Sequence, residues 1–236
     1  MTSTPPKQHR PLALDEVKRL LAKASGHPDE PLLMTALATG LRRGELLALR
    51  WSDLDLEQGT LAVRRAVDVT GHEAEPKTAA GCRMIVLPGV LIEVLQQQRT
   101  HQDEAKQAAG AAWQERELVF ASPSGGFRDP AHLRRFLHEI AERAGMGSVG
   151  FHALRQTTTF LLLSLGVPTQ VVLDMLGLRR TTQPFSFLSP VSLALHREAM
   201  AKLDALLRAR PGAETDGLRA PVSPQEEEQD EQRRDA

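Results

Sequence analysis

Apolar residues at helical spacing run through most of this 236-residue chain and are interrupted by one strand-rich interval. On both sides of that interval, apolar residues recur at spacings of three and four positions, which predicts amphipathic helices. The interval, residues 59–88, holds two runs rich in Val, Ile and Leu around a polar loop, so we expect a small antiparallel sheet there. The predicted helices are residues 14–24, 31–40, 44–51, 91–108, 129–145, 152–166, 168–177 and 192–209. The expected fold class is α+β and mainly helical.

Charge is distributed unevenly between the body of the chain and its end. Residues 213–236 carry eight acidic and three basic side chains, whereas residues 1–212 carry 26 basic and 22 acidic ones, a net charge of +4. The end segment has almost no apolar residues, and such a composition cannot offset the entropy of ordering. We therefore expect residues 211–236 to form a disordered acidic tail and residues 1–11 to form a flexible arm.

Several classes of protein do not fit the sequence. The single cysteine, Cys82, cannot form an internal disulfide, and the N-terminal residues lack the apolar stretch of a secretory signal. The most apolar run, residues 160–167, is far shorter than the roughly 20 residues of a spanning helix. We expect a cytoplasmic protein with no membrane contact, and no motif indicates a cofactor or a metal ion.

The motif "TGLRRGELLALRW", residues 39–51, carries the first indication of chemistry. Gly40 allows the backbone to turn sharply, and Arg42 and Arg43 follow it directly at the start of a helical run. The amides at a helix N-terminus add a positive end to the two guanidinium groups. This arrangement is suited to holding a phosphate.

Four stretches, in order, resemble the catalytic domain of tyrosine recombinases, the phage integrase family. They are "ALATGLRRGELLALRWSDLDL", "EPKTAAGCRMIVLP", "LVFASPSGGFRDP" and "FHALRQTTTFLLLSLGVPTQVVLDMLG". The resemblance implies a catalytic domain over residues 12–210, without the helical core-binding domain that usually precedes it. It also implies a chemistry in which a tyrosine attacks a DNA phosphodiester while fixed cations stabilise the charge on the phosphate oxygens.

By the same resemblance, Arg42 in "TGLR", with His152 and Arg155 in "HALR", would hold the phosphate, since a guanidinium can donate two hydrogen bonds to it. Lys77 in "PKT" would protonate the leaving 5′ oxygen. The alternatives are surface salt bridges for the arginines, a solvated loop lysine and a histidine satisfied in the core. Arg43 would point elsewhere, as a surface residue or a contact to the DNA backbone.

The family pattern fails after residue 177. Leu178 occupies the position of an expected histidine and Leu188 that of the nucleophilic tyrosine, and the sequence contains no tyrosine at all. Ser186 and Ser189 flank the gap, but a serine hydroxyl is far less acidic than a phenol and would need an activating base. We therefore expect weak binding to the backbone of double-stranded DNA without strand cleavage.

Other interpretations stay open. The chain could be a degenerate mobile-element remnant, an active recombinase whose 178–190 segment reflects a frameshift or sequencing error, or a helical interaction module that modulates an active recombinase. The C-terminal helix could dock on its own domain, which we favour, or on another integrase-like protomer. The tail could keep the protein soluble or compete with DNA for the basic surface. The apolar stripe of this helix comprises Leu195, Met200, Leu203, Leu206 and Leu207.

Overall fold

The computed structural model describes residues 10–68, 71–74, 82–178 and 190–208. Lys77 and Leu188 lie outside these residues, as do the acidic tail and most of the predicted N-terminal arm. The described part is mainly helical with a small antiparallel sheet, as the sequence predicts. Within it, no helix is both long enough and apolar enough to cross a membrane.

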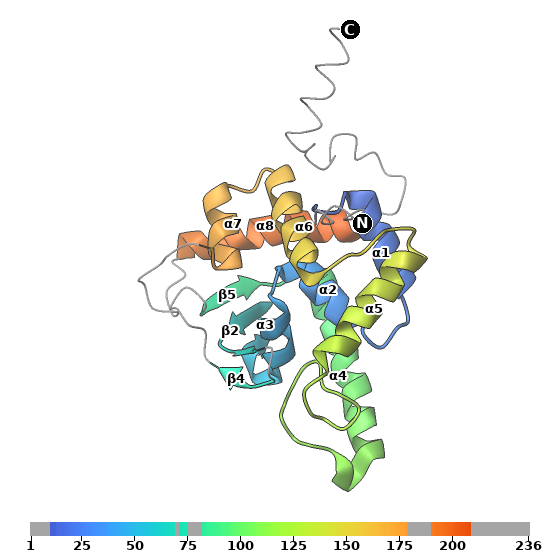
Figure 1. Ribbon diagram of the computed structural model, residues 1–236. Helices are drawn as coiled ribbons and strands as arrows, with labels where there is room; N and C mark the ends of the chain where they lie inside the picture. The colour runs from blue at the N-terminus through green and yellow to red at the C-terminus, as the bar shows by residue number, and fades with distance from the viewer. Residues whose placement is uncertain (1–9, 69–70, 75–81, 179–189, 209–236) are drawn as a thin grey trace, which may run out of the picture.

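The helices lie close to their predicted positions, and Figure 1 shows most of them above and to the right of the small sheet. Their ends differ from the predicted ones by at most three residues, as is common for helix boundaries. Short 3-10 turns follow α3, at Trp51–Asp53, and α4, at Gly110–Ala112. The helices are α1 (Leu14–Ala24), α2 (Glu30–Thr39), α3 (Arg43–Ala48), α4 (Gly89–Ala109), α5 (Pro130–Arg143), α6 (Phe151–Ser164), α7 (Thr169–Leu176) and α8 (Pro190–Arg208).

The strand-rich interval forms two small sheets instead of one. β1 (Leu54–Asp55), β2 (Thr60–Val63) and β5 (Arg83–Val86) make an antiparallel sheet in the order β1-β2-β5. β3 (Ala66–Val67) pairs with β4 (Glu73–Ala74) in a separate antiparallel pair. The first predicted run is broken between β2 and β3, where two consecutive arginines, Arg64 and Arg65, both form ion pairs with the buried Asp53.

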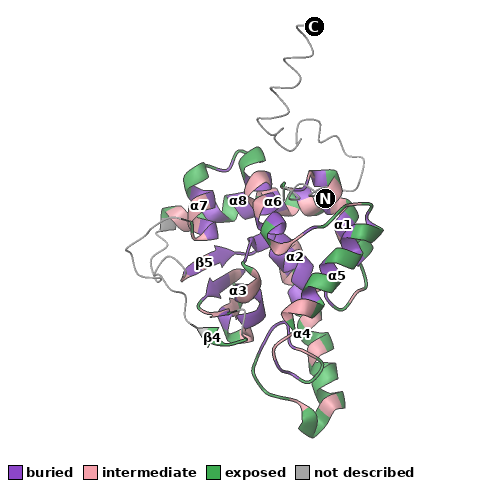
Figure 2. Ribbon diagram, in the orientation of Figure 1, coloured by how far each residue is buried: buried purple, intermediate pink, exposed green. Residues whose placement is uncertain are grey.

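Helix α2 lies at the centre of the core and is buried along almost its whole length (Figure 2). It contacts α1, α4 and α6, which explains why its apolar residues surround the helix instead of forming one stripe. A hydrogen bond ties it to α6, where the Thr158 hydroxyl donates to the Leu37 carbonyl at 2.8 Å. Helices α2 and α6 therefore form the rigid support for the segments that follow each of them.

Helix α8 docks on its own domain, against α4, α6, α7 and β5. Met200, Leu203 and Leu206 of the predicted stripe are buried, whereas Leu195 is 40% exposed. The Asp204 carboxylate accepts a hydrogen bond from the Val90 amide at 2.6 Å, and thus caps the N-terminus of α4. A contact between this helix and another protomer stays a prediction.

We expect Leu203→Ala to lower the free energy of unfolding by about 2 to 5 kcal/mol, because truncating a fully buried leucine leaves a cavity. The matched control is Leu195→Ala on the exposed side of α8, which should change that free energy by about 0.5 kcal/mol or less. Urea unfolding followed by circular dichroism measures both. Equal effects of the two substitutions would contradict the docking of α8 described above.

Candidate phosphate-binding site

The turn between α2 and α3 depends on Gly40. This residue ends α2 in the left-handed conformation, with φ of 62°, and its amide donates to the Ala36 carbonyl at 3.0 Å. A Cβ atom at this position would collide with the Leu176 side chain of α7. A glycine is therefore required here both by the backbone conformation and by the close approach of α7. The chain then places Arg42 at the N-cap of α3.

Glu45 is a buried carboxylate that binds two arginines. The backbone amide and the guanidinium of Arg42 donate to it at 2.8 and 2.9 Å. Arg83 of β5 donates to both of its oxygens, at 3.0 and 2.9 Å, and donates through Nε to the Met175 carbonyl at 2.9 Å. Glu45 is 5% exposed and Arg83 is 7% exposed. These bonds hold the start of α3, the edge of the sheet and the end of α7 together.

Burial raises the pKa of Glu45, but the hydrogen bond and charge of Arg83, aided by Arg42, outweigh that effect. The net result is a pKa below the ordinary value of 4.5, so the carboxylate is ionised at neutral pH. A buried charge needs such partners, because an unpaired carboxylate in the core would be strongly disfavoured.

Arg155 of α6 lies at the same junction and is 8% exposed. Its Nη1 donates to the Gly40 carbonyl at 2.6 Å, and its Nη2 donates to the Leu176 carbonyl. Burial lowers its pKa to about 10, and the nearby charges of Arg42 and Arg83 act in the same direction while Glu45 opposes them. The guanidinium stays charged at neutral pH and has five N–H donors, so these two bonds leave donors for a ligand.

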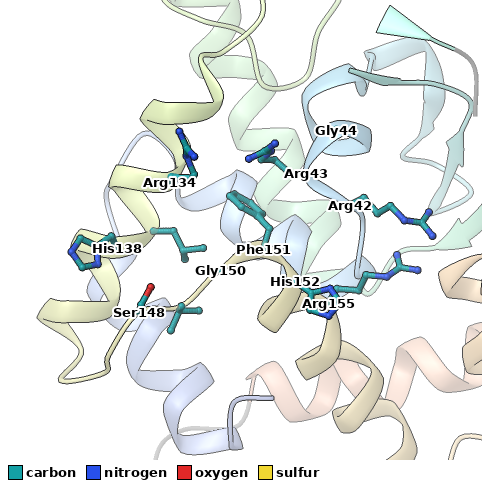
Figure 3. A pocket seen from close by; sticks show the side chains of 12 residues that line it. Arg42, Arg43, Gly44, Arg134, His138, Ser148, Gly150, Phe151, His152 and Arg155 are labelled. Carbon is teal, nitrogen blue, oxygen red and sulfur yellow. The ribbon is translucent and has the colours of Figure 1, made fainter. Parts of the chain in front are cut away.

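Arg42, His152 and Arg155 line one pocket of about 500 Å³ (Figure 3). Arg42 and Arg155 extend side by side in this view. His152 is exposed at the N-terminal end of α6, and it has no hydrogen bond or ion pair with the described residues. Arg43, which we expected to point away from the site, lines the same pocket on the side of Phe151.

Two residues that organise the site were not singled out in the sequence. Glu45 lies three positions after the N-cap Arg42, which is the spacing of a capping box. Arg83 is a lone charge in the apolar run that forms β5, and such a residue needs a buried partner. Leu178, at the position of the expected histidine, is 52% exposed just after α7. Lys77 and Leu188 lie outside the described residues, so their roles stay predictions.

Comparisons with known proteins agree with this architecture. Residues 10–183 match the phage integrase family. The tyrosine recombinase XerC-like protein of Caldanaerobacter subterraneus subsp. tengcongensis is 34% identical over 178 residues, which are 69% of this chain and 46% of that protein. An integrase of Saccharopolyspora erythraea is 24% identical, over 71% of this chain and 51% of that protein. This chain therefore spans about half the length of these curated relatives.

A solved structure shares the fold. The Tn1549 transposon integrase in complex with transposon right end DNA aligns with a TM-score of 0.63 at 17% identity, over 85% of this chain and 69% of that chain. At this level of identity the likeness shows the fold and not the activity.

We expect Glu45→Gln to lower the free energy of unfolding at pH 7 by about 3 kcal/mol or more, because it leaves Arg83 buried without its counter-charge. A carboxylate whose folded pKa is lowered stabilises the fold above its ordinary value and loses this contribution as the pH falls through the lowered pKa. The stability of the variant should therefore fall less steeply than that of the wild type as the pH falls below the ordinary value of 4.5. Urea titrations at several pH values measure this, with the exposed Glu139→Gln as control. Parallel pH profiles for wild type and Glu45→Gln would refute the role of this ion pair.

Proposed function

This chain belongs to the phage integrase family of tyrosine recombinases, and we propose that it binds the phosphate backbone of double-stranded DNA without cleaving it. The observation that carries the proposal is the combination of a pocket lined by Arg42, His152 and Arg155 with a sequence that contains no tyrosine. The first feature supports binding of a phosphate, and the second removes the nucleophile that defines the chemistry of the family.

The geometry of the two arginines supports phosphate binding. Glu45 fixes Arg42 at the rim of the pocket, and two backbone carbonyls fix Arg155 behind it. Cations held in this way lose little side-chain entropy when they bind, and guanidinium groups are well suited to phosphate oxygens. Backbone contacts of this kind position a protein on DNA and carry no sequence information directly. The net charge of +4 over residues 1–212 supports weak, salt-sensitive binding.

Several observations support the absence of cleavage. The match to the family ends at residue 183, ahead of Leu188 at the nucleophile position. Leu178, which replaces the expected histidine, cannot donate a hydrogen bond to a phosphate. Arg42 and Arg155 can stabilise charge on a phosphate, but they form no covalent intermediate. We infer that the cation site has been kept while the nucleophile has been lost.

The position of helix α8 is relevant to the alternative function, in which this chain is an interaction module that modulates an active recombinase. The apolar stripe that would reach another protomer is largely buried against the α4, α6, α7 and β5 elements of the same chain. Direct contact with DNA through the pocket lined by Arg42, His152 and Arg155, here called the cation pocket, is therefore better supported than modulation of a recombinase through this helix.

The first prediction of this proposal concerns covalent chemistry. Incubated with a nicked suicide duplex, the protein should form no covalent adduct with DNA that survives a denaturing gel, because no phenol is present to attack the phosphodiester. An active tyrosine recombinase on its own substrate serves as the positive control. An adduct mapped by mass spectrometry to Ser186 or Ser189 would overturn the proposal.

The second prediction concerns the contact of Arg42. We expect Arg42→Gln to weaken binding to a fully paired duplex and to reduce the slope of log K against log salt by about 0.9, the contribution of one phosphate contact. Arg83 still pairs with Glu45 in this variant, so the fold should persist. The matched control is Arg19→Gln, an exposed arginine on α1 that does not line the pocket. Equal slopes for wild type and Arg42→Gln would reject Arg42 as a phosphate contact.

A further inference from the structure

The half of the pocket beside α5 has a different character from the half beside Arg42 and Arg155. Its surface includes the apolar side chains of Leu137, Val149 and Phe151. Arg43 and Arg134 border this apolar surface, and Figure 3 shows both side chains on the same side of the Phe151 ring, with Arg43 the nearer. A site that needed to hold phosphate alone would not require an aromatic ring at its centre.

The local sequence explains how the ring is presented. Phe151 is the first residue of α6, directly after the N-cap Gly150, whose backbone is extended. The ring is half-buried, with one part packed on the core and another part facing the pocket. Leu137 of α5 lies in the wall of the pocket, one turn after Arg134 on the same helix. An apolar surface and a cation are thus placed next to each other by the helical repeat of α5.

The two arginines beside the ring are not neutralised within the described structure. Arg43 and Arg134 form no ion pair and no hydrogen bond with the described residues, whereas His138 of the same pocket lies 3.4 Å from the Glu142 carboxylate. The pocket therefore presents the unpaired charges of Arg43 and Arg134 on one side of its apolar surface, and Arg42 and Arg155 lie on another side of it. A ligand that fits must combine a flat apolar group with negative charge on either side of it.

We propose that this pocket binds one unpaired nucleotide of a DNA strand. The base stacks on Phe151, the phosphate on one side meets Arg43 and Arg134, and the phosphate on the other side meets Arg42 and Arg155. The volume of about 500 Å³ lies within the usual range for sites that enclose a small ligand. This inference rests on the proposed binding to the DNA backbone and adds the form of DNA that the pocket prefers.

Base pairing determines whether a DNA base can stack on the Phe151 ring. In a duplex each base is covered by its neighbours, so its face can reach an aromatic side chain only after the nucleotide leaves the stack. An unpaired base offers its face freely, and stacking on an aromatic ring tolerates any base because every base has a π-face. The pocket should therefore favour bulged or single-stranded positions over fully paired DNA, with little preference for sequence.

The experiment compares three duplexes of the same sequence: fully paired, with one unpaired thymidine, and with one unpaired abasic residue. The abasic duplex has the same extra backbone and flexibility but lacks the base. Fluorescence anisotropy at fixed salt should show the wild type binding the thymidine bulge about fivefold or more tightly than the abasic bulge. Equal affinity for the two bulges would overturn the inference.

Substitutions of Phe151 test whether the preference for the thymidine bulge arises from stacking on its ring. Phe151→Leu keeps an apolar side chain at the start of α6 and should abolish the preference for thymidine over the abasic residue. Phe151→Trp restores an aromatic face and should restore the preference. The matched control is Phe160→Leu, a partly buried phenylalanine of the same helix that does not line the pocket, and it should keep the preference.

The two proposals fail in different ways. If the wild type does not distinguish the two bulges while Arg42→Gln still reduces the salt slope on paired DNA, the nucleotide pocket is refuted and backbone binding stands. If none of the three duplexes binds, both proposals are refuted. If Phe151→Leu keeps the preference while its unfolding transition matches that of the wild type, stacking on Phe151 is refuted.

Discussion

The buried carboxylate of Glu45 connects the parts of the chain that meet at the pocket. It accepts hydrogen bonds from Arg42 at the start of α3 and from Arg83 of β5. Arg83 also donates a hydrogen bond to the Met175 carbonyl of α7. Two positive charges could not gather beside the buried Arg155 without it, because their mutual repulsion and desolvation would disfavour the fold. The cation pocket is therefore a consequence of how the core is held together.

Stability and binding share the same residues at this junction. Arg155 binds the carbonyls of Gly40 and Leu176, so it joins the end of α2 to the end of α7 while it lines the pocket. Arg155 therefore contributes to folding whether or not the chain has a nucleophile. This gives a physical reason for the cation site to persist in a protein without tyrosine, since its loss would leave polar groups of the core without partners.

The two halves of the pocket depend on different parts of the structure. The half with Arg42 and Arg155 is held by Glu45 and by backbone carbonyls, whereas the half with Phe151 is lined by residues of α5 and of the N-terminal end of α6. Changes to one half should therefore leave the other intact. This separation allows backbone contact and base contact to be tested by independent substitutions.

The sequence by itself determined the helices, because their apolar spacing is a local property, and it determined that the chain contains no tyrosine. It also indicated Arg42, His152 and Arg155 through motifs of adjacent residues. Only the tertiary structure decided that Arg43 and Arg134 line the same pocket, that Glu45 pairs with Arg83, and that the strand run breaks into two sheets. These features join residues far apart in the chain, and a periodic pattern carries no information about which charged residues form ion pairs.

Arg83 shows most clearly what the sequence cannot predict. Its position in an apolar strand predicts that it has a buried partner, but only the folding of α3 against β5 selects Glu45.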